Sequence, residues 1–264
     1  MRLFDRSRAA VLPTPFGALL VERGRSLIGE LGALSKEIES LRGLESGELR
    51  IGAGLYPAEL SVGTAVGRLS ARYPGIRVSL QAVQWREVIA LVTADEVDVA
   101  VVELSPFQGE SRMALEPLPR HPVAFVCRPG HPLLRERRPS ITRILAFPLV
   151  GARLPRRFAE NAGSPAPTLR SDPLSGDLLP LLHIESIALA KRIVPVCDAV
   201  ALLPVQSIAS EAAAGILAMV DCQPAWLTTN YGFVHLKGRT LSPASLAFMA
   251  EVRQAEAELV ISAG

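Results

Sequence analysis

The segment Val97-Asp98-Val99-Ala100-Val101-Val102 is a nearly continuous run of β-branched and small apolar residues. A run of this kind is typical of a parallel strand that is buried on both faces of its sheet. Residues 49–52 and 76–83 also have the composition of strands, and helical patterns follow them at 57–72 and 85–94. Strands and helices that alternate in this way predict a doubly wound α/β domain, with a ligand crevice at the carboxyl ends of its strands.

A second series of strands and helices follows this domain. The expected elements are strands at 122–127, 147–151, 199–204 and 231–236 and helices at 186–194 and 242–259. The late strand and helix are what a chain produces when it crosses to a second lobe and returns to the first. We therefore predict two doubly wound α/β lobes, with lobe I comprising residues 47–126 and 234–264 and lobe II comprising residues 127–233.

One long amphipathic helix precedes the α/β region. Thr14 and Pro15 are typical of its N-cap and first position, and Gly43 and Gly47 are stop signals. At about 1.5 Å per residue this helix would be roughly 42 Å long. Its apolar side has the spacing of a coiled-coil seam and consists of Leu20, Leu27, Leu31, Leu34, Ile38 and Leu41. We predict that this stripe is a dimerisation surface, and a core helix between two domains is the alternative.

The first residues of the chain predict a β-hairpin. Residues 3–6 and 10–12 have the composition of two short strands that residues 7–9 connect. A two-stranded hairpin is marginally stable by itself in water, so it needs either another chain or a further part of this one as a partner. We therefore expect that the chain begins in the middle of a domain.

Composition and charge narrow the class of protein. The chain has 264 residues, 49% of them hydrophobic, and a net charge of +2, which gives no general affinity for polyanions. Its three cysteines are far apart and indicate buried thiols in a reducing compartment. No apolar run reaches the length of about 18 residues that a membrane span needs, and no signal peptide is evident. We expect a cytoplasmic protein that has no membrane partner.

Several short motifs occur in the order seen in LysR-type transcriptional regulators, and the chain resembles that family over essentially its whole length. The motifs are RLFDR at 2–6, LPTPFGALL at 12–20, GELRIG at 47–52, YPGI at 73–76, VDVAVV at 97–102, GHPL at 130–133, IES at 184–186 and LLP at 202–204. Each motif is weak by itself, and their shared order makes the resemblance specific.

The resemblance implies a winged helix-turn-helix that reads DNA, a linker helix that dimerises, and a two-lobed effector-binding domain like a type 2 periplasmic binding protein. Residues 1–46 would then hold the wing hairpin and the linker helix, and residues 47–264 the effector-binding domain. Arg2, Arg6 and Arg8 would be the wing residues that contact DNA. The recognition helix would lie before Met1, so we expect the chain to lack most of the helix-turn-helix. The expected partners are a homodimer or homotetramer, a small-molecule effector, and DNA.

The residues that follow the first strand predict one side of a ligand cleft. Gly52-Ala53-Gly54 resembles the start of a dinucleotide-binding loop, but Pro57 stands where the third glycine would fall. Pro57 instead begins a helix whose free backbone N–H groups, near Leu55 and Tyr56, can hold a carboxylate or a hydroxyl group.

Polar residues follow other strands in the same way. Gln84 and Trp85 suit a small ligand with polar edges and an apolar face, although Trp85 is equally compatible with the lobe core. Arg153 could pair bidentately with an anion, and a solvated surface arginine is the alternative. Glu185 and Glu103 are ambiguous, because Glu185 could instead cap its own helix.

We therefore predict an effector site between the lobes. Because Arg153 is the only cation in the set, we expect a small anionic or polyhydroxylated metabolite. The predicted residues are Leu55, Tyr56, Pro57, Gln84, Trp85, Glu103, Gly151, Ala152, Arg153, Glu185, Ser186 and Pro204.

Patterns of catalytic and cofactor sites are missing. The sequence has no GxSxG nucleophile elbow, no P-loop and no paired cysteines, and its four histidines lack metal-ligand spacing. We expect no enzymatic activity, no metal and no cofactor. A transcriptional regulator is the favoured function. The alternative is a stand-alone cytosolic small-molecule-binding protein that does not bind DNA.

Overall fold

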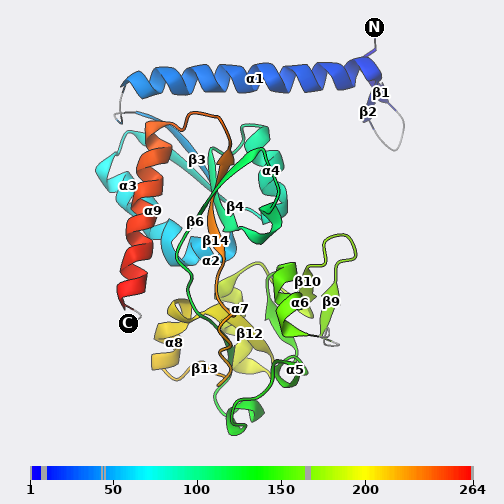
Figure 1. The fold of residues 1–264 in the computed structure, drawn as a ribbon, viewed down its shortest axis with the longest axis vertical. Helices are drawn as coiled ribbons and strands as arrows, with labels where there is room; N and C mark the ends of the chain where they lie inside the picture. Colours follow the sequence, from blue (N-terminus) through cyan, green and yellow to red (C-terminus); the bar gives the residue numbers. More distant parts are fainter. Residues whose placement is uncertain (1, 7–10, 43, 45, 164–167, 263–264) are drawn as a thin grey trace.

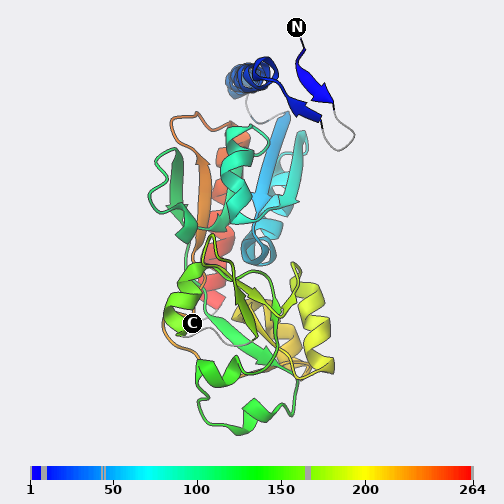
Figure 2. The ribbon, with the colours of Figure 1, turned by 90° about the vertical axis from the view of Figure 1, so that its right-hand side faces the viewer.

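The chain folds into two lobes stacked along the long axis, and one long helix lies across the far end of the first lobe (Figures 1 and 2). This arrangement comes from a computed structural model, which describes residues 2–6, 11–42, 44, 46–163 and 168–262. For residues 5, 6, 11, 12, 33, 35–42 and 262 it describes the backbone only.

The N-terminal hairpin leads directly into the long helix. Strands β1 (Phe4–Arg6) and β2 (Val11–Pro13) pair antiparallel, and helix α1 (Pro15–Arg42) follows. Thr14 caps α1, because its Oγ1 accepts a hydrogen bond of 3.1 Å from the backbone N–H of Gly17. The hairpin strands agree with the sequence pattern to within one residue. Helix α1 begins where Thr14 and Pro15 predict, and it ends at Arg42, four residues before the predicted limit of residue 46.

The predicted apolar stripe of α1 faces solvent. The side chains of Leu20, Leu27, Leu31 and Leu34 are 53–65% exposed. A groove separates α1 from lobe I, and its lining on the helix side is Ala18, Val21, Glu22, Arg25, Ser26, Gly29 and Glu30. The stripe residues are absent from that lining, so they lie on another side of α1. The side chains of Ile38 and Leu41, which complete the predicted seam, lie outside the described residues.

Lobe I contains a five-stranded sheet in the order β4-β3-β5-β14-β6. Its strands are β3 (Gly47–Ala53), β4 (Ile76–Ala82), β5 (Val99–Glu103), β6 (Met113–Pro117) and β14 (Tyr231–Leu236). Strands β3, β4 and β5 are parallel, and β14 runs antiparallel to β5 and β6. Val99 and Val101 contact one core while Ala100 and Val102 contact the other, so β5 is buried on both faces as its sequence predicts.

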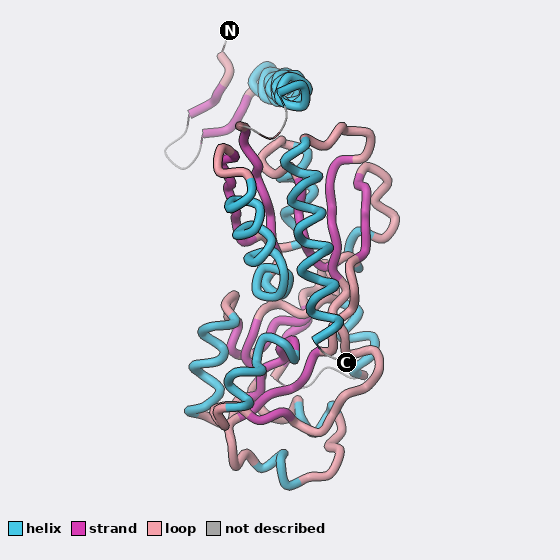
Figure 3. The backbone as a smooth tube through the Cα atoms, turned by 90° about the vertical axis from the view of Figure 1, so that its left-hand side faces the viewer, coloured by secondary structure: helices cyan, strands magenta, loops and turns pink. Residues whose placement is uncertain are grey.

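Helices cover both faces of this sheet. One face carries α2 (Leu55–Pro57), a π-helical segment (Ala58–Val62), α3 (Gly63–Arg72) and α9 (Pro243–Ser262), and the other carries α4 (Trp85–Thr93). Helix α9 runs along lobe I toward lobe II (Figure 3). A short 3-10 turn, η2 (Ser105–Phe107), follows β5.

Lobe II contains a second five-stranded sheet, in the order β11-β8-β12-β7-β13. Its strands are β7 (Val123–Cys127), β8 (Leu149–Gly151), β11 (Leu182–His183), β12 (Val200–Pro204) and β13 (Ala218–Met219). Its helices and turns are η3 (Pro132–Arg135), α5 (Ile141–Ile144), α6 (Arg156–Ala162), α7 (Ile187–Ile193), η4 (Val194–Val196), η5 (Val205–Ile208) and α8 (Ala209–Ala213). A separate hairpin of β9 (Leu169–Ser171) and β10 (Leu178–Pro180) extends from this lobe; the sequence reading missed this hairpin and β6.

The points where the chain crosses between lobes differ from the predicted ones. All of β7 pairs within the lobe II sheet, and all of β14 pairs within the lobe I sheet. The crossings therefore lie near residues 118–122 and 228–230, and the predicted boundaries after residues 126 and 233 are too late. Composition alone does not locate the crossings, because strands of either sheet are equally apolar.

A buried polar network holds the two crossing segments together. His121 and Thr229 exchange hydrogen bonds, since each backbone N–H reaches an oxygen of the other residue at 2.9 Å. His121 Nε2 also lies 2.5 Å from a carboxylate oxygen of Glu256 on α9, and the Tyr231 hydroxyl donates to the other oxygen at 2.9 Å. The Glu256 carboxylate is fully buried, so these contacts satisfy a charge that would otherwise be costly.

Candidate ligand-binding cleft

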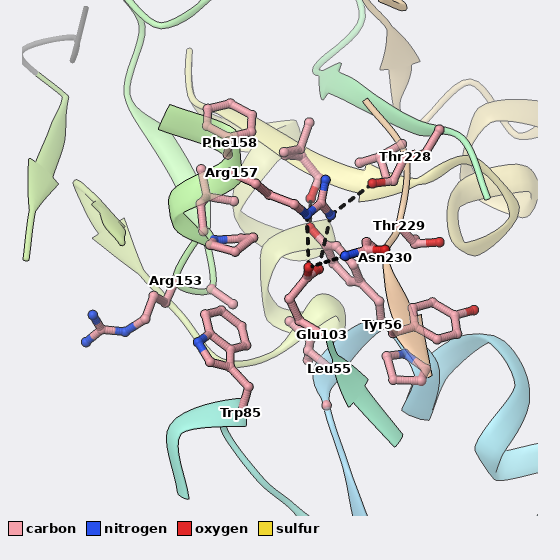
Figure 4. A pocket seen from close by; sticks show the side chains of 18 of the residues that line it. Leu55, Tyr56, Trp85, Glu103, Arg153, Arg157, Phe158, Thr228, Thr229 and Asn230 are labelled. Atoms are coloured by element: carbon pink, nitrogen blue, oxygen red, sulfur yellow. Dashed lines mark hydrogen bonds and ion pairs between the residues drawn. The ribbon is translucent and has the colours of Figure 1, made fainter. Parts of the chain in front are cut away.

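The two lobes enclose a cavity at the carboxyl ends of β3 and β5, beside the crossing segment at residues 228–230 (Figure 4). The cavity has a volume of about 80 Å³ in this arrangement of the lobes. Its lining is mainly apolar and consists of Gly54, Leu55, Tyr56, Pro57, Trp85, Glu103, Val123, Ala152, Arg153, Leu154, Pro155, Arg157, Phe158, Leu202, Leu227, Thr228, Thr229, Asn230 and Tyr231. An apolar cleft between two lobes with a few converging polar groups has the usual character of a small-molecule site.

An ion pair between the lobes lies at the centre of this cavity. The guanidinium of Arg157, on α6 of lobe II, binds both carboxylate oxygens of Glu103, at the end of β5 in lobe I, at 2.9 and 3.0 Å. Arg157 also donates to the carbonyl oxygen of Thr228 at 3.0 Å. The Asn230 amide donates to Glu103 at 3.1 Å, so the crossing segment supports both partners. Dashed lines in Figure 4 mark this network.

Tyr56 forms a second direct link between the lobes. Its hydroxyl, at the start of the helical segment after β3, donates a 2.7 Å hydrogen bond to the carbonyl oxygen of Leu202 on β12. Burial raises the pKa of the Tyr56 hydroxyl, so the group stays protonated and remains a donor. Leu55 and Tyr56 also pack against an apolar cluster of lobe II. The cleft is thus in a closed arrangement.

A further set of ion pairs joins the lobes near one edge of the cleft. Arg86 of α4 binds Asp177 at 2.6 Å and Asp172 at 3.2 Å, and both aspartates belong to the β9–β10 region. Arg153 binds the same Asp172 oxygen at 2.9 Å. The pKa of the Asp172 carboxyl is lowered by the backbone N–H of Leu174 and by the two arginines. This side of the cleft therefore closes through charge pairs in which Arg86 is partly exposed and Asp177 is buried.

The predicted site residues divide into two groups. Those that line the cavity are Leu55, Tyr56, Pro57, Trp85, Glu103, Ala152 and Arg153, and those outside its lining are Gln84, Gly151, Glu185, Ser186 and Pro204. Arg153 contributes to the wall, but its guanidinium binds Asp172 and points away from the Glu103 carboxylate (Figure 4). The geometry thus differs from the expectation that Arg153 is the cation of the cleft.

Local structure accounts for most of the residues outside the lining. Ser186 caps α7, because its hydroxyl accepts from the backbone N–H of Leu189 at 3.3 Å, and Gln84 occupies the N-cap of α4. The Glu185 carboxylate lies 2.7 Å from the ring of His183. Pro204 is buried at the end of β12.

The sequence reading missed Arg157, Phe158 and the lining residues of the second crossing, 227–231. Arg157 stood in a run of charged residues that reads as a solvated face. Helix α6 begins directly after Pro155, and successive side chains on a helix differ in direction by about 100°. The position at which α6 begins therefore determines which arginine faces the cleft. Arg156 is exposed, and Arg157 lines the cavity. Residues 227–230 carry no sequence motif. They line the cavity because the chain crosses from lobe II to lobe I there.

The described part of the chain contains no cluster of three or more histidine, cysteine or acidic residues that could hold a metal ion. No helix among the described residues is both long and apolar enough to span a bilayer. Of the predicted wing residues, Arg2 is exposed, the side chain of Arg6 is outside the described residues, and so is all of Arg8.

Comparison with solved structures places this architecture in a known fold. An H2O2-bound OxyR mutant from Corynebacterium glutamicum matches with a TM-score of 0.64 and 17% identity, over 98% of this chain and 80% of that chain. The effector binding domain of QuiR in complex with shikimate matches with a TM-score of 0.60 and 15% identity, over 81% of this chain and 98% of that chain. At these identities the likeness shows the fold alone.

Sequence comparison identifies the family. The model of the LysR substrate binding domain matches residues 42–257. An SDS degradation transcriptional activation protein from a Pseudomonas species is 34% identical over 250 residues, which are 93% of this chain and 79% of that protein. The HTH-type transcriptional regulator GbpR from Azospirillum brasilense is 26% identical, over 96% of this chain and 73% of that protein. The chain therefore belongs to the LysR family of transcriptional regulators.

Proposed function

We propose that this regulator responds to a small-molecule effector that binds in the cavity between its lobes. One observation carries the proposal: an apolar cavity, crossed by the Arg157–Glu103 ion pair, separates two lobes that contact each other around its rim. A ligand in this position touches both lobes at once. The ligand can therefore shift the protein between an open and a closed arrangement of the two lobes.

We further propose that the response is transmitted through a homodimer or homotetramer that α1 assembles. The exposed leucine stripe of α1 supports this proposal, because an apolar surface of this kind is normally covered by a partner. A shift of the lobes would then change how the assembly presents its DNA-binding ends, to which the N-terminal hairpin belongs. We place this activity in the cytoplasm, where promoters are accessible, and we assign the chain no enzymatic step.

A thermal-shift screen of small metabolites tests the effector site. A ligand that binds only the folded chain stabilises it by about 2.7 kcal/mol at a hundredfold excess over Kd. The screen should include an alkyl sulfate, since the name of the Pseudomonas relative connects that protein with the degradation of SDS. We expect at least one compound to raise the melting temperature.

A variant that fills the cavity separates binding in the cleft from binding elsewhere. Ala152 lines the cavity, so Ala152→Trp should abolish the shift that a hit produces. The matched control is Ala214→Trp at the end of α8, where the side chain is exposed and outside the cavity lining. A hit that stabilises both variants equally would place the ligand outside the cleft and contradict the proposal.

A further inference from the structure

Both guanidinium groups in the described part of the cavity lining are already bound to a carboxylate of the chain itself. Among the described lining residues the cations are Arg153 and Arg157, and Arg153 is engaged by Asp172. Arg157 holds the Glu103 carboxylate in the fork geometry that a guanidinium offers to a free carboxylate or sulfate. The two side chains are 26% and 13% exposed, so solvent screens this pair only in part.

The wall around the pair is suited to a hydrocarbon rather than to a polyhydroxylated molecule. Apolar side chains from both lobes form most of it, namely Leu55, Pro57, Trp85, Val123, Leu154, Pro155, Phe158, Leu202 and Leu227. Two of the polar groups among them are already engaged within the protein. The Tyr56 hydroxyl donates to Leu202, and the Asn230 amide donates to Glu103. The Thr228 hydroxyl and Arg153 Nε have no hydrogen-bond partner among the described residues and are therefore open to a ligand. A sugar-like ligand would still leave most of its hydroxyl groups without partners, which is costly in a buried site.

We infer that the Glu103 carboxylate is an internal stand-in for the head group of the effector, and that the effector is an amphipathic monoanion. Its sulfate or carboxylate head replaces Glu103 on Arg157, and its hydrocarbon part lies along the apolar wall. This inference rests on the proposed function, because it takes the cleft between the lobes as the effector site.

The surroundings of Glu103 allow this exchange. Arg157 Nε, the Asn230 amide and the backbone N–H of Ser105 all donate to the same oxygen, Glu103 Oε1, at 2.9, 3.1 and 3.3 Å. When Arg157 turns from this carboxylate toward the ligand, Glu103 therefore keeps the other two hydrogen bonds. Both of those donors lie close to Glu103 at the carboxyl end of β5, on the lobe I side of the cleft, and do not depend on lobe II. Glu103 therefore competes with the ligand for Arg157, and its carboxylate has hydrogen-bond donors both when the ligand is bound and when it is absent.

If the Arg157–Glu103 ion pair serves only to hold the lobes together, its removal should have a different effect on ligand binding. Removal of a mere latch would loosen the closed arrangement and weaken the binding of any ligand in the cleft. Removal of an internal competitor should instead strengthen the binding of an anion. The substitution Glu103→Gln separates the two, since the amide oxygen still accepts the hydrogen bonds from Asn230 and Ser105 while the negative charge is lost.

The experiment is isothermal titration of the full chain with octyl sulfate and octanoate, each well below its micelle concentration. The probes for the separate parts are 1-octanol for the hydrocarbon and inorganic sulfate for the head group. We expect one site per chain that binds an octyl anion at least about tenfold more tightly than 1-octanol, as a charge-assisted bond implies. If octyl sulfate binds and octanoate does not, the head group is a sulfate, and the reverse result assigns a carboxylate.

The variants give opposite expected effects. Glu103→Gln should lower the Kd for the octyl anion about tenfold, and Arg157→Gln should raise it about tenfold or more. Arg157→Lys, which keeps the charge and loses the fork, covers the case in which Arg157→Gln does not fold. The matched control is Arg156→Gln, because Arg156 is the preceding residue on α6, lies outside the cavity lining and has its own partner in Glu160. Its Kd should equal that of the unaltered chain.

Several results would overturn the inference. These are equal affinity for 1-octanol and octyl sulfate, no binding of either octyl anion, an unchanged or weaker affinity in Glu103→Gln, or an unchanged affinity in both Arg157 variants. In each case the proposed function can still be judged separately. A neutral metabolite whose binding is lost in Ala152→Trp would keep the cleft as the effector site while refuting the anionic amphiphile.

Discussion

The leucine stripe of α1 makes the assembly of this regulator testable by two substitutions. Leu27 and Leu34 are 60% and 53% exposed. Full burial of an exposed leucine side chain contributes about 1.5–3 kcal/mol, so covering each of these contributes about 1–2 kcal/mol. In a dimer both chains contribute the two residues, and the double substitution Leu27→Asp, Leu34→Asp removes about 4–8 kcal/mol of association free energy.

This loss corresponds to a dissociation constant that is at least about a thousandfold higher, since about 1.4 kcal/mol is a factor of ten. Sedimentation velocity over a range of concentrations should show the unaltered chain as a dimer or tetramer and the double variant as a smaller species. The matched control is Ser26→Asp, Gly29→Asp, which introduces the same residues on the groove side of the same helix. A double leucine variant that sediments like the unaltered chain would refute the coiled-coil interpretation of α1.

Three further predictions concern buried and paired groups. Replacing Glu256 with alanine removes one partner of a buried charged network and should lower the free energy of unfolding by about 3–5 kcal/mol; urea unfolding checks this, and a change below about 1 kcal/mol would contradict it. Burial raises the pKa of the Cys127 thiol to about 11, so iodoacetamide at about pH 8 should leave Cys127 unmodified until the chain unfolds. Arg253 lowers the pKa of the Glu116 carboxyl, so the pair stabilises the chain at neutral pH and its contribution disappears as the pH falls through the folded-state pKa. Both side chains are partly exposed, so Glu116→Gln should cost less than about 1 kcal/mol at neutral pH and nothing in acid, as judged by melting temperatures.

The sequence predicts the strands and the family well because those depend on local patterns. The run at 97–102 and the alternation at 231–236 mark β5 and β14 without knowledge of any neighbour. The order of weak motifs from residue 2 to residue 204 agrees with the matched family. The α1 helix is also clear, since its cap and its apolar repeat both lie within one segment.

The interior of the cleft is harder to predict from the sequence, because its contacts join residues that are far apart in the chain. Glu103 and Arg157 are 54 positions apart and belong to different lobes. No pattern around either residue indicates the other. The direction of Arg153 depends in turn on Asp172, which directly follows hairpin strand β9, and composition does not reveal that strand. Residues at strand ends could be placed near the cleft, but which of them face one another depends on how the lobes close.

Hydrogen–deuterium exchange tests most directly whether a small molecule binds between the lobes. The measurement compares the chain alone with the chain saturated by a compound that raises its melting temperature. We expect slower exchange on both sides of the cavity, at residues 54–57 in lobe I and 152–158 in lobe II, together with the crossing segment at 227–231. Slower exchange that is confined to one lobe, or to α1, would contradict binding between the lobes.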